Sequence, residues 1–213
     1  MFSERWLAPS LTAVMLAAPA FAPAAASAVD VPCLPLPSPA AQTCPQQSGS
    51  VSGAQSEPQS SKQFSVTATP DLARSLLVEV NRTRRAHGLR ALASSSRLTK
   101  AAAAHAQALA AAGQFTHAWP TTGRQFGTWI RGFYPARGYR LWSAGENLLW
   151  ASPGFTPTSA VQQWLASPEH RRVMLTPSWR ELGIGVVSAV AAPAAYGGMD
   201  VQIAAAEFGT RRA

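Results

Sequence analysis

The stretch that decides the fold is an apolar run with one acid in its middle: Leu141-Trp142-Ser143-Ala144-Gly145-Glu146-Asn147-Leu148-Leu149-Trp150. A run of this length and composition is typical of a buried strand. A carboxylate buried without partners is strongly destabilising, so Glu146 requires a cation, a metal ion or several hydrogen-bond donors. Two histidines, His117 and His170, are the candidate partners. The functional question is whether these three side chains meet.

The residues around this strand alternate between helical and strand-like patterns. Helices are predicted from Thr69-Pro70-Asp71 to Gly88, from Ser94, Ser95 or Ser96 to Gly113, from Phe126 to Arg137, from Thr156-Pro157 onward, and from Ser167-Pro168-Glu169 onward. Residues 181–187 and 201–208 are strand-like and are expected to pair with each other. Helices and strands mixed without regular βαβ alternation predict an α+β layered domain with an antiparallel sheet.

Two histidines sit in different local settings. His105 lies on the apolar face of the second predicted helix, where a histidine is more often a hydrogen-bonded core residue than a ligand. His170 falls in the first turn of the helix that follows Ser167, where the helix dipole, Arg171 and Arg172 all disfavour an imidazolium. A neutral imidazole is the form that binds a metal ion or accepts a hydrogen bond.

Residues 1–28 have the features of an export signal. Arg5 precedes a short apolar core at residues 11–18, and Ala26-Ser27-Ala28 fits a small-residue cleavage site. Prolines at positions 9, 19 and 23 break the segment below the length of a membrane span, and no later segment is apolar enough to form one. The predicted location is therefore secreted and extracellular.

Residues 29–68 are rich in Pro, Ser, Gln and Ala and contain few large apolar residues. This composition predicts a disordered linker, which places the folded domain at residues 69–213. Cys33 and Cys44 lie in the linker and could close one disulfide loop in an oxidising compartment, or remain free thiols.

The domain is strongly basic. From Thr69 to Ala213 the chain carries 16 basic and 7 acidic residues, and Lys100 is the only lysine among the 16. Such a surface favours anionic partners, including cell-envelope polymers. The export signal, and the lack of a Lys/Arg run interleaved with aromatic residues, argue against nucleic acid as the partner.

Five segments resemble, in their order, the CAP superfamily, also called the SCP domain family, in its bacterial secreted branch. They are Leu77-Val78-Glu79-Val80-Asn81 with Arg84 and Gly88-Leu89; Ala104-His105-Ala106 to Phe115-Thr116-His117; Ser143-Ala144-Gly145-Glu146-Asn147; Trp164-Leu165-Ala166-Ser167-Pro168-Glu169-His170-Arg171; and Glu181-Leu182-Gly183-Ile184-Gly185. The resemblance covers residues 71–209, and although no single motif is specific, five in register make an accident improbable.

The resemblance implies a three-layer α-β-α sandwich with a central antiparallel sheet and a cleft lined by His and acidic side chains. In the better-known eukaryotic members the cleft holds two His and two Glu and can bind a divalent metal ion. His117, Glu146 and His170 match three of these four positions. The fourth, expected three residues after Trp164, is Ser167 here, which puts a four-ligand site in question.

Glu169 and Glu181 are alternative sources of the missing acid. Glu169 is also explained by its place in the first turn of a helix, and Glu181 as an exposed charge at a strand edge. Two neutral imidazoles and one carboxylate, with a water molecule, would make a competent zinc site, and that water could act as a nucleophile.

Three functions remain open. The first and preferred one is a secreted binding or interaction module. Its His/Glu-lined cleft would bind a divalent metal ion or a small ligand, or the cleft or an apolar groove would bind an envelope component or a lipid, since the resemblance includes members that bind sterols or fatty acids. The second is a metal-dependent hydrolase that uses His117, Glu146 and His170, although no HExxH helix or Gly-x-Ser-x-Gly elbow is present. The third is an electrostatic binder of anionic cell-envelope polymers, held by its arginine surface.

Overall fold

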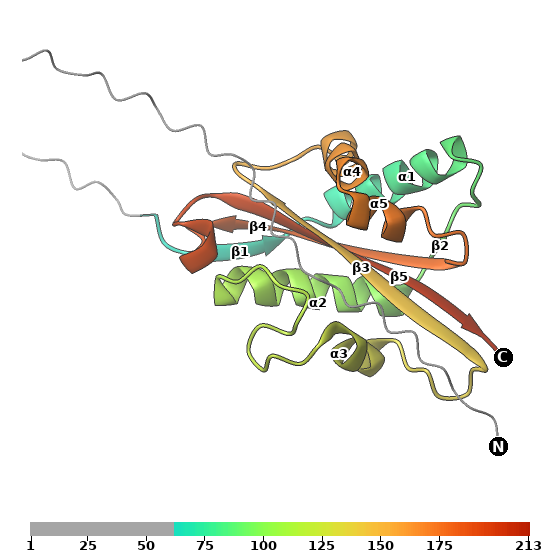
Figure 1. Ribbon diagram of the computed structural model, residues 1–213. Helices are drawn as coiled ribbons and strands as arrows, with labels where there is room; N and C mark the ends of the chain where they lie inside the picture. The colour runs from blue at the N-terminus through green and yellow to red at the C-terminus, as the bar shows by residue number, and fades with distance from the viewer. Residues whose placement is uncertain (1–61) are drawn as a thin grey trace, which may run out of the picture. The chain divides into compact units, whose positions relative to one another are not determined.

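The computed structural model describes residues 62–213, which contain one central sheet with helices on both faces (Figure 1). The predicted export signal, Cys33, Cys44 and most of the predicted linker lie outside the described residues. The strands are β1 (Ser65–Ala68), β2 (Ala93–Ser94), β3 (Leu141–Ala151), β4 (Glu181–Val190) and β5 (Val201–Arg212). The helices are α1 (Pro70–Ala86), α2 (Ser96–Ala112), α3 (Phe126–Phe133), α4 (Pro157–Ala166) and α5 (Pro168–Met174), with a short 3-10 helix at Ala194–Tyr196.

The strands follow the order β1-β4-β5-β3, and every neighbouring pair on this path is antiparallel. The two-residue β2 pairs in parallel with the start of β4. The predicted pairing of residues 181–187 with 201–208 is confirmed, because β4 and β5 run side by side through the middle of the sheet. The expected α+β sandwich with a central antiparallel sheet is therefore the observed architecture.

Alternation along the strands divides the sheet into two apolar faces. Leu182, Ile184 and Val186 of β4 pack with α1, α4 and α5 on one face. The opposite face packs against α2 and α3, which lie together on the other side of the sheet in Figure 1. The core therefore consists of two layers of side chains, one above and one below the sheet.

Helix α2 lies very close to β4. A Cβ atom on Gly183 would stand 2.1 Å from the carbonyl carbon of Leu98, and one on Gly185 would stand 2.3 Å from the amide nitrogen of Ala103. The alanines of α2 that face the sheet, Ala101, Ala102 and Ala106, are completely buried. Glycines on the strand and alanines on the helix thus allow the two backbones to approach, which brings His105 of α2 close to the sheet.

Two boundaries differ from those predicted. Residues 65–68 fall within the predicted linker, but they form the edge strand β1, which at four residues is too short to give a strong strand signal. Helix α3 ends at Phe133 instead of continuing to Arg137, because Pro135 disfavours helical geometry at the residue before it. Among the described residues, no helix combines the length and the apolar character needed to cross a bilayer.

Candidate functional site

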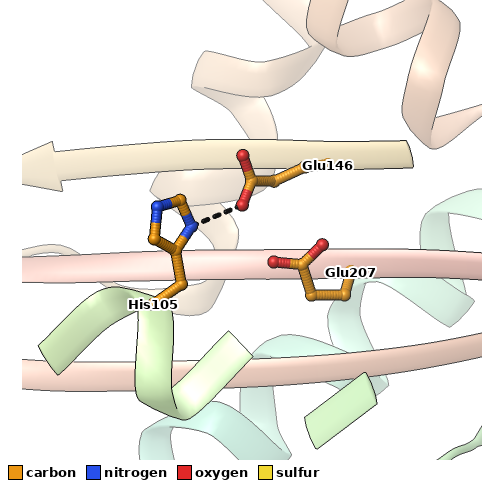
Figure 2. Close-up of side chains that lie close together, drawn as sticks. All are labelled: His105, Glu146 and Glu207. Atoms are coloured by element: carbon orange, nitrogen blue, oxygen red, sulfur yellow. Dashed lines mark hydrogen bonds and ion pairs between the residues drawn. The ribbon is translucent and has the colours of Figure 1, made fainter. Parts of the chain in front are cut away.

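The candidate site is built around Glu146, at the centre of β3. Its side chain is 1% exposed and points toward the α2 face of the sheet, where it meets the ring of His105. Glu207 of β5 is the residue directly opposite in the ladder and is completely buried. Opposed residues on neighbouring antiparallel strands project to the same face. Two carboxyl groups therefore lie side by side on the α2 face of the sheet, as Figure 2 shows.

His105 of α2 covers these two carboxyl groups. Its Nδ1 lies 2.6 Å from Oε1 of Glu146, and its Nε2 lies 3.3 Å from the carbonyl oxygen of Ala118. The ring also packs against Trp129, at a centroid distance of 4.6 Å, and Trp119, at 5.8 Å, and these two indoles contact each other at 5.3 Å. His105 is thus a hydrogen-bonded core residue, as its position on the apolar helix face predicts, and it is one of the two imidazoles that contact the acid.

His117 is the second imidazole, and it comes from the loop between α2 and α3. Its Nδ1 lies 2.5 Å from Oε2 of Glu146, and its side chain is 38% exposed. The indole N–H of Trp129 donates to the backbone carbonyl of His117 at 3.0 Å and anchors the loop. Because Nδ1 is engaged with the carboxylate, Nε2 is the nitrogen that this half-exposed ring offers to a ligand.

His170 takes a different place. It lies in the first turn of α5, and its backbone carbonyl accepts a hydrogen bond from the side-chain amide of Asn147 at 2.9 Å. Asn147 follows Glu146 in β3, so its side chain projects to the opposite face of the sheet. In the described part of the chain, the ring of His170 makes no hydrogen bond to Glu146 or His117. The structure therefore joins two of the three predicted site residues directly and leaves the third outside their hydrogen-bond network.

The other candidate side chains are engaged elsewhere. The hydroxyl of Ser167 caps α5 by accepting from the His170 N–H at 3.4 Å, and it also contacts the carboxylate of Glu169. Glu181 accepts from the hydroxyl of Tyr134 and pairs with Arg211 at 3.4 Å. None of these three side chains supplies a free ligand next to Glu146.

The charges of the site follow from its contacts. Burial favours the neutral form of Glu146, but hydrogen bonds from His105 and His117 outweigh it and lower its pKa to about 2. Burial also opposes protonation of His117, yet the Glu146 carboxylate raises the pKa of His117 overall. Burial, and then the nearby charge of His117, lower the pKa of His170, which disfavours its imidazolium form.

Glu207 is the member of this cluster that sequence analysis did not identify. Neither of its carboxyl oxygens has a hydrogen-bond partner among the described residues. Burial, and then the negative charge of Glu146, raise its pKa well above the ordinary value. A sequence signal for Glu207 exists, since it is an acid within the apolar run 201–208, but only the pairing register places it against Glu146.

Replacing Glu207 by glutamine is expected to make stability less dependent on pH. A group whose pKa is raised by folding stabilises the fold below its unfolded pKa of about 4.3, and this contribution is lost as the pH rises through the folded value. Glu207→Gln should therefore gain stability relative to the wild type as the pH rises from about 5 to about 8, measured by urea unfolding with a chelator present. A stability difference that stays constant over this range would contradict the assignment.

The sequence matches a known protein family over much of the described domain. The family model described as "CAP: Cysteine-rich secretory protein family" matches residues 77–192. The protein YkwD of Bacillus subtilis (strain 168), described as uncharacterized, is 33% identical over 107 residues. That match covers 50% of this chain and 39% of YkwD, so this chain spans well under half of the relative's length.

Two solved structures resemble this fold. An outer surface protein from Borrelia burgdorferi has a TM-score of 0.56 at 19% identity, and the match covers 70% of this chain and 100% of that one. An extracellular protein containing a SCP domain from Bacillus anthracis str. Ames has a TM-score of 0.47 at 24% identity, covering 68% of this chain and 41% of that one. At 19% identity, the Borrelia protein supports the fold alone.

Proposed function

Because the chain belongs to the CAP family of cysteine-rich secretory proteins, we propose that it acts outside the cytoplasm as a binding module whose ligand-contacting side chains are His117 and His170. The features of an export signal in residues 1–28 support the location. The name of the structurally similar Borrelia burgdorferi protein, an outer surface protein, is in keeping with it.

The observation that carries the proposal is that both oxygens of Glu146 are engaged by histidines. A general base needs a free acceptor and a pKa near the working pH. Glu146 has its two oxygens against His105 and His117, a side chain that is 1% exposed, and a pKa of about 2. This carboxylate is suited to orienting His117, and it is poorly suited to activating a water molecule.

A divalent metal ion, which the family implies, fits these residues in a restricted way. A metal-ligating histidine commonly donates its other ring N–H to a carboxylate, and His117 has this arrangement with Glu146. His170 offers an imidazole whose pKa is lowered, which favours the ligating form. β3 is an edge strand, and the charge of His117 acts on His170, so the two rings can approach each other around this edge although they come from opposite sides of the sheet. An ion such as Zn²⁺ would be held there by His117 and His170 and would supply a Lewis-acidic anchor for an anionic or carbonyl group of a ligand.

The proposal is tested by titrating the purified chain with Zn²⁺ in a calorimeter. His117→Ala and His170→Ala are each expected to weaken binding at this site at least about tenfold. His87→Ala is the matched control, because His87 is exposed and lies at the far end of α1. Unchanged affinity in both site variants would overturn the proposal. Metal-dependent turnover of peptide or ester substrates, lost in a folded His117→Ala variant, would establish the hydrolase instead.

A second candidate function is binding of anionic envelope polymers. It is favoured by the region around α3, where four exposed arginines occur between Gly113 and Gly145 without an acidic residue: Arg124, Arg131, Arg137 and Arg140. Exposed charges interact through solvent and are strongly screened by salt. Polymer binding of this type would vanish at high salt and would survive substitution of His117 and His170, which separates it from the first function.

A further inference from the structure

A second cluster of side chains of metal-ligating types lies inside the core, next to the contact between His117 and Glu146. It consists of His105 from α2, Glu146 from β3 and Glu207 from β5, which face one another in Figure 2. Each of the three offers one ligand atom, and these atoms all lie within 4.8 Å of one another. All three residues are buried, and His105 and Glu207 are completely so.

The hydrogen bonds of this cluster do not balance. Both nitrogens of His105 face oxygen acceptors, Glu146 on one side and the carbonyl of Ala118 on the other. A neutral imidazole carries one N–H and can satisfy only one of them. Glu207 adds two more buried oxygens, neither of which has a partner in the described part of the chain. With two carboxyl groups side by side, the cluster needs either a proton on Glu207 or a cation between the two acids.

We propose that His105, Glu146 and Glu207 form an inner binding site for a divalent transition-metal ion, with Zn²⁺ as the best match. The donor set has one imidazole nitrogen and two carboxylates, and imidazole selects ions such as zinc over Mg²⁺ and Ca²⁺. Two carboxylates neutralise a divalent charge in this buried site, and the second oxygen of Glu207, which has no other partner among the described residues, can fill the fourth position of a tetrahedral ion. In the metal-bound form, Nε2 of His105 would carry the proton and donate it to the carbonyl oxygen of Ala118, and Nδ1 would bind the ion. Metal-bound histidines commonly donate their other ring N–H to a carbonyl or carboxylate oxygen in this way.

The ligand atoms need only small shifts to accept the ion. Ligands about 2.1 Å from a tetrahedral zinc ion stand roughly 3.4 Å apart. The short contact between His105 and Glu146, now 2.6 Å, would widen, and the longer separations, up to 4.8 Å, would close. The rings of Trp119 and Trp129 cover His105 and hold its orientation while these shifts occur.

This inner site goes beyond the proposed function and does not depend on it, because it uses neither the Nε2 of His117 nor the ring of His170. The experiment uses His170→Ala as the background. This change disables the outer pair, His117 and His170 of the proposed function, without altering a residue that contacts the Glu146 side chain. The full chain is unfolded in a chelator and refolded with excess Zn²⁺, because a buried ion enters as the chain folds. Bound metal is then counted by elemental analysis after removal of free metal.

The His170→Ala protein is expected to retain one equivalent of zinc per chain. Adding Glu207→Gln should lower zinc affinity by more than the roughly 10–100-fold that loss of an outer-shell partner causes. Glu181→Gln is the matched control, since it alters another strand glutamate outside the cluster and should leave the zinc in place. Zinc-free refolded protein, or equal affinity with and without Glu207→Gln, would overturn the proposal.

X-ray absorption of the bound zinc gives a readout that does not depend on the Glu207→Gln variant folding. In the His170→Ala background the inner site predicts one imidazole and otherwise oxygen ligands around the ion. Two imidazoles in that spectrum would overturn the inner site. If only the outer pair failed to bind zinc, the wild type and the His170→Ala variant would each bind one equivalent of zinc. That result would contradict the proposed function and leave the inner site intact.

Discussion

Replacing Glu146 by alanine is expected to lower the free energy of unfolding by about 3–5 kcal/mol, because it removes the shared partner of two imidazoles. Glu146 is buried and contacts His105 at 2.6 Å and His117 at 2.5 Å. Without it, His105 keeps a completely buried ring nitrogen with no acceptor, and a cavity opens between α2 and the sheet. The loss is measured by urea unfolding at neutral pH with a chelator present.

Two further substitutions test the cause of this loss. Glu146→Gln keeps the volume and one acceptor oxygen, so it should lose less stability than Glu146→Ala. Glu169→Ala removes an exposed carboxylate that contacts Ser167, and it should change stability by no more than about 1 kcal/mol. Equal losses of unfolding free energy in Glu146→Ala and Glu169→Ala would show that the hydrogen bonds from His105 and His117 to Glu146 do not stabilise the fold more than an exposed contact does.

Gly183→Ala is expected to destabilise the protein by about 3 kcal/mol, because the added methyl group would clash with the backbone of α2. Its Cβ would lie 2.1 Å from backbone atoms of both Leu98 and Thr99, and a backbone cannot move aside as a flexible side chain can. Helix α2 would have to shift away from β4 and would carry His105 with it. Urea unfolding gives the stability change, and loss of the inner metal site would follow from the displaced histidine.

Gly132→Ala is the matched control for this prediction. Gly132 lies within α3, and a Cβ placed there meets nothing within 4 Å. Alanine has the higher helix propensity, so this variant should be neutral or more stable by up to about 1 kcal/mol. Similar losses in Gly183→Ala and Gly132→Ala would show that close packing of α2 on the sheet is not what Gly183 provides.

The elements of the fold could be predicted where the local signal is strong. The alternation and apolar content of residues 181–187 and 201–208 predict strands that pair, and they do so in β4 and β5. Proline at the start and glycine after the end predict α1 closely, and Gly113, with φ of 61°, ends α2 where expected. The edge strand β1 has only four residues, so its local signal was weak. It forms a strand because it pairs with β4, which is distant in the sequence.

The candidate site could be predicted only in part, for a geometric reason. A buried acid needs donors, and this requirement alone indicates that histidines should surround Glu146. Which histidines do so depends on the face of the sheet to which each side chain projects. His105 and His117 reach the α2 face, whereas α5, with His170, packs on the side to which Asn147 points.

The sequence by itself determined that this chain builds a CAP domain, with its pattern of helices and strands, and that one acid would be buried among histidines. Hydrophobic periodicity and the energetic cost of a buried charge are local properties, so they can be recognised in one dimension. Only the tertiary structure decided that Glu207 lies against Glu146 and that α2 supplies His105. Strand register and the close approach of helix to sheet bring together residues that are 41 and 61 positions away from Glu146 in the chain.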